Sequence, residues 1–224
     1  MPEPNPPGRR PLASRDVPFF RNLAAGLARV GVTPNTISFF SIIFAVASGA
    51  ALAWTTHADG WTLRLCWLGA AAGIQLRLMA NLLDGLVAVE GRQGGPTGDL
   101  WNEAPDRFSD VAIFIGAGFA AGSDVLLGFG AALAAVLVAY IRALGASVGT
   151  GQIFLGPQAK PHRMFVLTVV CVVTAAVPVF PSRIGQEPLP LMTLALWIVI
   201  AGCIVTIGRR LACIASVLRA KGRK

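Results

Sequence analysis

The side chains best suited to catalysis or metal binding lie in one stretch, residues 81–110, with the sequence NLLDGLVAVEGRQGGPTGDLWNEAPDRFSD. The whole chain has eleven acidic residues, and six of them fall here: Asp84, Glu90, Asp99, Glu103, Asp106 and Asp110. Most of the remaining sequence is apolar. Because a carboxylate is costly to place in apolar surroundings, a cluster of this kind indicates a functional site. Glu90, Arg92 and Glu103 are the exceptions, and we interpret them as interfacial charges that reach water.

Helical spacing sorts these side chains onto two faces, because residues three or four apart lie on the same side of a helix. The first face holds Arg77, Asn81, Asp84 and Ala88, with Gly85 beside them. The second face follows a glycine-rich connection and holds Gly98, Asn102, Asp106 and Asp110. If the two helices are antiparallel neighbours, their oxygen atoms point toward each other.

Such a site is typical of a hard divalent cation. Carboxylate and amide oxygens suit Mg²⁺, Mn²⁺ or Ca²⁺, whereas zinc prefers nitrogen and sulfur. A cation of this kind can hold phosphoryl oxygens. Asp84 and Asp106 together supply a charge of −2, which suits one divalent ion better than two. Arg77 lies about 10 Å deeper than Asp84 by helical rise, and is either a counter-ion of the acidic cluster or a second phosphate contact.

The composition predicts an all-α integral membrane protein. Of 224 residues, 54% are apolar and 13% are charged, against roughly 25% charged in a soluble domain. Six runs are apolar enough for helices that span a bilayer, which needs about 20 residues each. These runs are 36–56, 62–89, 99–121, 124–148, 163–181 and 189–215.

Charge near the ends of these runs predicts their orientation. The formal charge of +8 is dispersed at the ends of segments, which favours membrane orientation over nucleic-acid binding. Lys and Arg gather on one side, so we expect both termini and the active site in the cytosol, in a multi-pass protein of the cytoplasmic (inner) membrane. Residues 1–13 are expected to be a disordered cytosolic tail, and 14–224 a single membrane domain. Within it, 14–30 is predicted to form an interfacial amphipathic helix.

A family resemblance rests on the acidic stretch. The pattern Asn81-x2-Asp84-Gly85-x2-Ala88-Val89-x8-Gly98-x3-Asn102-x3-Asp106 resembles the signature of the CDP-alcohol phosphotransferase family, Asp-x2-Asp-Gly-x2-Ala-Arg-x8-Gly-x3-Asp-x3-Asp. The spacing matches throughout, whereas Asn81, Asn102 and Val89 depart in residue type. GVTPNTIS (31–38), YIRA (140–143) and KPHRM (160–164) extend the resemblance over nearly the whole chain.

The resemblance implies a membrane enzyme of phospholipid synthesis with six spans. Members transfer a substituted phosphoryl group from a CDP-linked donor, often CDP-diacylglycerol (CDP-DAG), to a small alcohol, and CMP leaves. It implies that Asp106 is the catalytic base and that Mg²⁺ or Mn²⁺ is held by Asn81, Asp84, Asn102 and Asp106. It places the CDP against Asn35, Asp84, Gly85, Ala88 and Gly98. It also implies a possible homodimer.

The same resemblance implies that the acceptor pocket is ringed by Arg142, Lys160 and Arg163. Arginine binds phosphate through two parallel hydrogen bonds, so this ring favours an acceptor that carries a phosphate of its own, such as glycerol phosphate or inositol phosphate. Positive charge at the cytosolic face would explain Lys160 and Arg163 equally well. It explains Arg142 poorly, because Arg142 lies inside a predicted span.

Two further classes of function are open at this point. The missing carboxylates would also fit a catalytically silent relative that binds lipid or acts as a scaffold. A small transporter could use Asp84 and Asp106 as a relay for protons or ions. Against the transporter, both acids belong to one face of the membrane, and no series of ionisable residues continues to the other face.

Overall fold

The structure, a computed structural model, describes residues 17–90, 98–177, 183–184, 187–188 and 190–222. Helices dominate, which confirms the all-helical class: α1 (Pro18–Arg29), α2 (Pro34–Trp54), α3 (Gly60–Glu90), α4 (Gly98–Gly118), α5 (Val125–Ser147), α6 (Lys160–Ala176) and α7 (Leu191–Lys221). A 3-10 turn, η2 (Thr55–His57), follows α2. Before α7, β1 (Arg183–Ile184) and β2 (Glu187–Pro188) form a short antiparallel pair.

The helix ends differ from the predicted ones for local reasons. The α2 helix starts at Pro34 because the Thr33 hydroxyl accepts a hydrogen bond from the Thr36 N–H at 3.2 Å and proline fits a first turn. The α6 helix already starts at Lys160, with proline in its first turn. The α7 helix continues to Lys221, beyond the apolar run. Its last turn consists of Leu, Arg, Ala and Lys, which favour a helix whether or not the segment is apolar. Hydropathy therefore located the helices but not their polar ends.

Four stretches have the length and composition of membrane-crossing helices: Pro34–His57, Gly60–Val89, Val125–Ser147 and Leu191–Lys221. Many large apolar side chains on them remain exposed in the isolated chain, among them Phe39, Leu126 and Trp197. Lipid would cover these side chains, so the chain is a membrane protein.

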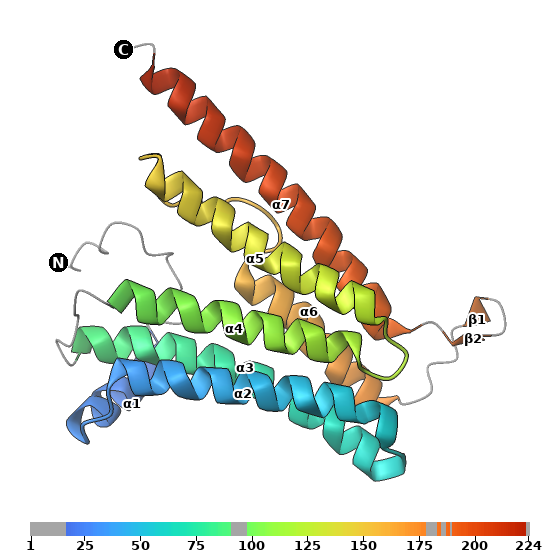
Figure 1. Ribbon diagram of the computed structural model, residues 1–224. Coiled ribbons are helices and arrows are strands. Elements are labelled where there is room, and N and C mark those ends of the chain that lie inside the picture. Colours follow the sequence, from blue (N-terminus) through green and yellow to red (C-terminus); the bar gives the residue numbers. More distant parts are fainter. Residues whose placement is uncertain (1–16, 91–97, 178–182, 185–186, 189, 223–224) are drawn as a thin grey trace.

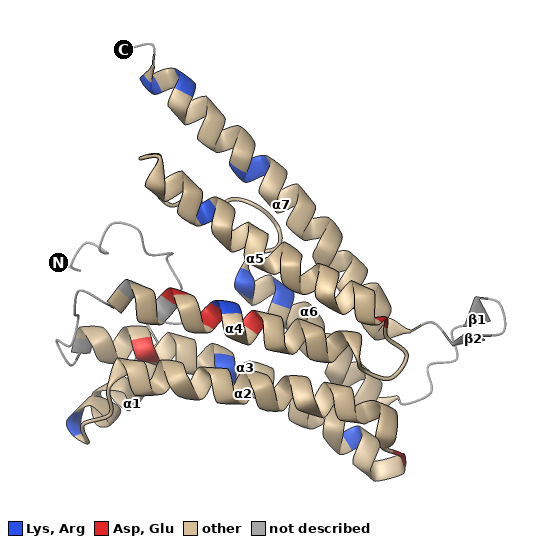
Figure 2. Cartoon of the chain, in the orientation of Figure 1, with Lys and Arg blue, Asp and Glu red and all other residues tan. Residues whose placement is uncertain are grey.

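Successive long helices run in opposite directions (Figure 1). The α2, α3 and α4 helices lie side by side, while α5 pairs with α7, and α6 packs between α3 and α7. As a result the start of α2, the end of α3 and the starts of α4 and α6 all lie toward one end of the bundle. Figure 2 shows that the acidic residues of α3 and α4, and most of the basic residues of α3 to α7, lie toward this same end.

The short helix α1 packs on the end of α3 that carries the acidic stretch. Ala24 is fully buried, and Phe20, Leu23 and Leu27 contact the apolar side chains of α3. Phe19 on the other side is exposed. The helix as described spans Pro18–Arg29 and has one apolar face against the bundle, while the tail predicted over 1–13 and the start of the predicted helix, 14–16, lie outside the described residues.

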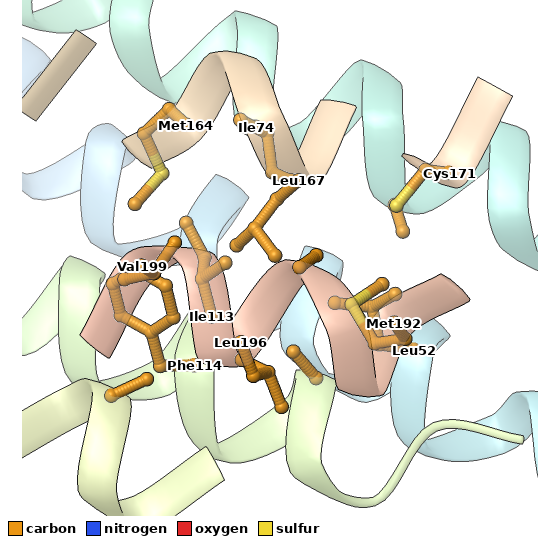
Figure 3. Close-up of a cluster of buried hydrophobic side chains, with 14 of the residues drawn as sticks. Leu52, Ile74, Ile113, Phe114, Met164, Leu167, Cys171, Met192, Leu196 and Val199 are labelled. Atoms are coloured by element: carbon orange, nitrogen blue, oxygen red, sulfur yellow. The ribbon is translucent and has the colours of Figure 1, made fainter. Parts of the chain in front are cut away.

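The hydrophobic core lies farther along the bundle, where all six long helices α2 to α7 meet (Figure 3). Its largest side chains include Trp67, Phe114, Met164 and Leu196. Small residues fill the remaining helix contacts, which lets the backbones approach closely, as is typical of helices packed in membranes.

The closest such contact joins α2 to α4. A Cβ atom added at Gly116 would overlap the backbone of Gly49, and one added at Gly49 would overlap the carbonyl of Ala112. Neither clash can be relieved by rotating a side chain. This contact fixes the position of α4, and therefore that of the acidic residues it carries.

We expect Gly116→Ala to lower the free energy of unfolding by about 1–3 kcal/mol, because the added methyl group forces α2 and α4 apart. Alanine by itself is a better helix former by about 1 kcal/mol. Gly69→Ala on α3 is the matched control, since a Cβ at Gly69 meets nothing within 4 Å. Thermal unfolding in detergent should show the first variant destabilised and the second unchanged or stabilised. Equal stability of the two variants would contradict the close contact.

Candidate active site

Asp106 is the hub of the candidate site. Its Oδ1 accepts hydrogen bonds from Asn81 Nδ2 at 2.5 Å and from Arg77 Nη2 at 3.3 Å, both on α3. Its Oδ2 accepts from Lys160 Nζ at 2.5 Å, at the start of α6. The α3 and α4 faces predicted to meet therefore do meet at Arg77, Asn81 and Asp106. Asp106 is buried and carries two cations and one amide on its two oxygens.

Asp110, one turn farther along α4, forms a second and deeper pair of ion pairs. Its Oδ1 accepts from Arg77 Nη2 at 2.7 Å, and its Oδ2 accepts from Arg163 Nη2 at 2.8 Å. All three side chains are at most 2% exposed. Arg77 therefore links both aspartates and is a counter-ion of the acidic cluster, the first of the two roles considered for it.

Two acids and three bases form this network, namely Asp106 and Asp110 with Arg77, Lys160 and Arg163. Asp84, also on α3, brings the formal charge of the six side chains to zero when all are ionised. Uncompensated charges of either sign would be costly at this depth. The balance explains how the bundle tolerates six ionisable side chains in its interior.

Asp84 occupies a different position from Asp106. Its Oδ2 accepts from the Ser38 hydroxyl of α2 at 2.7 Å, and the residue is only 4% exposed. Its Oδ1 is buried without a hydrogen-bond partner in the described part of the chain, and so is Oδ1 of Asn81, three residues earlier on α3. Buried polar atoms are seldom left unpaired. These two oxygens suit one hard cation, whose other ligands would come from a bound molecule or water.

The described residues do not form a cation site made of carboxylates alone. Among the described residues, no group of three His, Cys, Asp or Glu side chains is close enough to hold a metal ion. Asn81 is one reason, because its amide donates to Asp106, where a carboxylate would repel it. Asn102, another predicted ligand, lies on α4, but its side chain is outside what the structure describes.

The residues predicted to bind the CDP lie at the same end of the bundle. Gly85 and Ala88 follow Asp84 on α3, and both are partly exposed. Gly98 is the first residue of α4, and space around it is open, because an added Cβ would meet nothing within 4 Å. Asn35 is exposed in the first turn of α2.

Arg142 has a partner that the sequence did not predict. Its Nη2 donates to both carboxylate oxygens of Glu103, at 2.5 and 2.6 Å. Glu103 also accepts from Arg107, four residues later on α4, at 2.5 Å. Glu103 was interpreted as an interfacial charge, and its side chain is indeed 45% exposed, but it also holds two arginines.

The other two predicted acceptor contacts differ in access. The Lys160 side chain is 24% exposed and rests on Asp106, so its ammonium can reach a bound molecule by leaving that carboxylate. Arg163 is buried, with Nη1 donating to the Gln158 carbonyl at 2.8 Å and Nη2 to Asp110. Arg163 therefore holds Asp110 and the segment before α6 in place.

Arg210 is a further arginine inside the bundle. Although it lies in the second half of α7, toward the end with the basic residues, it is only 4% exposed. Its Nε donates to the Leu155 carbonyl at 2.9 Å and its Nη1 to the Val138 carbonyl at 2.7 Å. It ties the segment before α6, and with it Lys160, to α5 and α7.

The Asn81 contact leads to a test of metal binding. In Asn81→Asp, two carboxylates would face each other at hydrogen-bond distance. Their repulsion would destabilise the metal-free protein, and a cation between them would bind more tightly. We expect Mn²⁺ to bind roughly tenfold more tightly, a change of about 1.4 kcal/mol, as measured by electron paramagnetic resonance without substrates. Asn102→Asp is expected to act in the same direction. An unchanged or weaker Mn²⁺ affinity in both variants would show that the asparagines belong to a differently built site.

No family model matches the chain. A curated phosphatidylinositol phosphate synthase from Mycobacteroides abscessus is 27% identical over 195 residues, which is 84% of this chain and 80% of the relative. The crystal structure of Mycobacterium tuberculosis phosphatidylinositol phosphate synthase with CDP-DAG bound has a TM-score of 0.69 and 21% identity, covering 88% of this chain and 94% of that one.

A second structure of that enzyme, in complex with manganese and citrate, gives a TM-score of 0.68, with 21% identity over 87% of this chain and 88% of that one. At this identity the two structures show a shared fold. The sequence relative and the 26-residue signature spacing from Asn81 to Asp106 support a family relationship, which a shared fold alone does not. The chain therefore resembles phosphatidylinositol phosphate synthases in sequence and fold, and it has the signature spacing of the CDP-alcohol phosphotransferase family with asparagine at two of the four carboxylate positions.

Proposed function

We propose that the chain transfers a phosphatidyl group from CDP-DAG to a phosphorylated polyol and releases CMP. The observation that carries this proposal is the pairing of Asp106, placed among cationic donors, with the unpartnered oxygens of Asn81 and Asp84 on the facing helix. Inositol phosphate is the acceptor that fits best, because the curated relative is a phosphatidylinositol phosphate synthase. Glycerol phosphate has the same charged group and is the second acceptor to test.

In the proposed reaction, Asp106 is the general base. The acceptor hydroxyl oxygen forms a bond to the phosphorus that carries the diacylglycerol, and the bond from this phosphorus to the oxygen of CMP breaks. The hydroxyl proton passes to Asp106, which needs hydrogen-bond reach to that hydroxyl. Lys160 and Asn81 orient the carboxylate, and Lys160 must move off one oxygen so that this oxygen can accept the proton.

A divalent cation, Mg²⁺ or Mn²⁺, is part of this proposal. Asn81 and Asp84 would hold it through the two oxygens that lack partners, and Asp106 and Asn102 on α4 complete the proposed set. When bound, it would supply positive charge to the pyrophosphate of the donor. Gly85, Ala88, Gly98 and Asn35 are proposed to line the CDP, since they lie at the open end of α2, α3 and α4.

Membrane topology forms a second part of the proposal. We infer that α4 and α6 also cross the bilayer, which makes six spans. The α4 helix carries the ion-paired site residues, which lower its hydropathy, and α6 has 17 residues, about 26 Å long. The active site and both termini would then face the cytosol at the cytoplasmic (inner) membrane, and α1 would lie along its interface.

A homodimer remains part of the proposal. Large apolar side chains are exposed on α4, including Leu100, Trp101 and Phe108. Membrane lipid or a second copy of the chain would cover them. Cross-linking in the membrane tests this point separately from the activity.

The proposed reaction is tested by supplying purified protein in lipid with CDP-DAG, Mg²⁺ or Mn²⁺, and a panel of alcohols. We expect CMP release with inositol phosphate or glycerol phosphate, and much less with inositol or glycerol. One observation favours the silent relative as a second candidate, because both oxygens of Asp106 are already occupied by donors. A folded protein that binds CDP-DAG and releases no CMP with any alcohol would support that candidate.

A further inference from the structure

Arg142 is one of the partly exposed arginines at the rim of the site. Its side chain is 19% exposed, while Arg77 and Arg163 are at most 2% exposed and are tied to Asp110. Contacts other than Glu103 hold it in place. Its Nη1 donates to Gln152 Oε1 at 3.3 Å, and its guanidinium carbon lies 5.8 Å from the centre of the Phe154 ring. The guanidinium would therefore stay in position if Glu103 left it.

Glu103 has another partner to which it can move. Arg107 lies one helical turn away on the same helix and donates to Glu103 Oε2 at 2.5 Å, while Arg142 contacts both carboxylate oxygens. The Glu103 side chain is 45% exposed, so rotating it away from Arg142 would expose little surface that is now buried. One carboxylate is thus shared between an arginine of α5 and an arginine of its own helix.

A carboxylate and a phosphate monoester are alternative ligands of one guanidinium, because each presents two oxygens to its parallel N–H groups. We propose that Glu103 is a specificity-determining residue, whose carboxylate competes with the anionic group of the acceptor for Arg142 and turns to Arg107 when that group binds. This inference rests on the proposed function, in which Arg142 contacts the acceptor phosphate.

The competition would favour acceptors with a dianionic phosphate. An uncharged alcohol offers Arg142 nothing that would displace Glu103. A phosphate with nearly two negative charges outweighs the single charge of the carboxylate. Glu103 therefore lowers the affinity for every anionic acceptor, but it also keeps Arg142 from binding weaker anions.

The test compares the parent with Glu103→Gln, which keeps the shape of the side chain and removes its charge. Partly exposed ion pairs such as this one contribute modestly, and removing the repulsion of the phosphate adds to the effect, so we expect the acceptor KM to fall roughly three- to tenfold. The KM for CDP-DAG should not change. Inorganic phosphate, titrated into the protein in detergent micelles without donor, should bind more tightly by a similar factor.

Arg107→Gln gives a change of opposite sign. Without Arg107, Glu103 keeps Arg142 as its only partner among the described residues, so the acceptor KM should rise and phosphate should bind more weakly. Asp124→Asn is the matched control, because Asp124 caps α5 at the far end of the bundle and asparagine caps helices equally well. It should leave both measurements unchanged.

A weaker affinity of Glu103→Gln for inorganic phosphate, or an unchanged one, would overturn the inference, because Glu103 would then only brace Arg142. Phosphate binding decides this even if the parent releases no CMP. Failure of the proposed function is a separate result, namely that no acceptor supports CMP release by the folded parent.

Discussion

Replacing Asp106 by asparagine is expected to reduce CMP release by at least about 100-fold. General bases typically contribute 10²–10⁴-fold to the rate. The amide cannot accept the hydroxyl proton, and it also removes one of the two negative charges available to a divalent cation. The parent and Asp106→Asn should be compared in lipid at saturating CDP-DAG and acceptor, with the initial rate of CMP release as the measured quantity.

The fold should survive this change, because Arg77 keeps its shorter ion pair with Asp110, at 2.7 Å. Circular dichroism and gel filtration of Asp106→Asn should match the parent. Asp124→Asn makes the same chemical change away from the site and should retain full activity. If Asp106→Asn keeps a rate within threefold of the parent, Asp106 is not the base.

The second large effect is expected on stability, at Asp110. In Asp110→Asn, Arg77 keeps Asp106 but Arg163 loses its only carboxylate within the described part of the chain. Removing one partner of a buried ion pair typically costs about 3–5 kcal/mol. Thermal unfolding of the parent and the variant in detergent should show a loss of this size.

A double variant distinguishes loss of the charge pair from loss of packing. Asp110→Asn combined with Arg163→Gln removes both charges, so it should be more stable than Asp110→Asn alone, although the two sites contact each other and their effects will not add. If the free energy of unfolding of Asp110→Asn lies within about 0.5 kcal/mol of the parent's, as is usual for surface substitutions, the buried pair contributes little to stability.

Long apolar runs and local spacing were sufficient to predict the helices. Each of the six predicted spans overlaps one of the helices α2 to α7 over most of its length. The helical spacing also predicted that Arg77 and Asn81 of α3 face Asp106 of α4, because a helix leaves little freedom in where such residues point. These properties depend only on residues close together in the chain.

The partners of the charged residues could not be predicted in this way. Arg163 meets Asp110 from 53 positions away, and Arg142 meets Glu103 from 39 positions away. Both pairs depend on which helices are neighbours and how each is rotated, and the close contact at Gly49 and Gly116 helps to decide this. One local signal was available, since Asp110 continues the four-residue spacing of Asn102 and Asp106. That spacing marked a shared face, but it could not identify Asp110 as the carboxylate that pairs with Arg163.

The most direct measurement of the central claim is CMP release by the purified protein in lipid, quantified together with the lipid product. With CDP-DAG, inositol phosphate and Mg²⁺ or Mn²⁺, we expect CMP and a phosphatidyl inositol phosphate to appear in equal amounts. Both should be absent without acceptor, without the divalent cation, and in Asp106→Asn. A folded parent that binds CDP-DAG yet forms no CMP with any phosphorylated or unphosphorylated alcohol would contradict the account and leave a lipid-binding relative without catalysis.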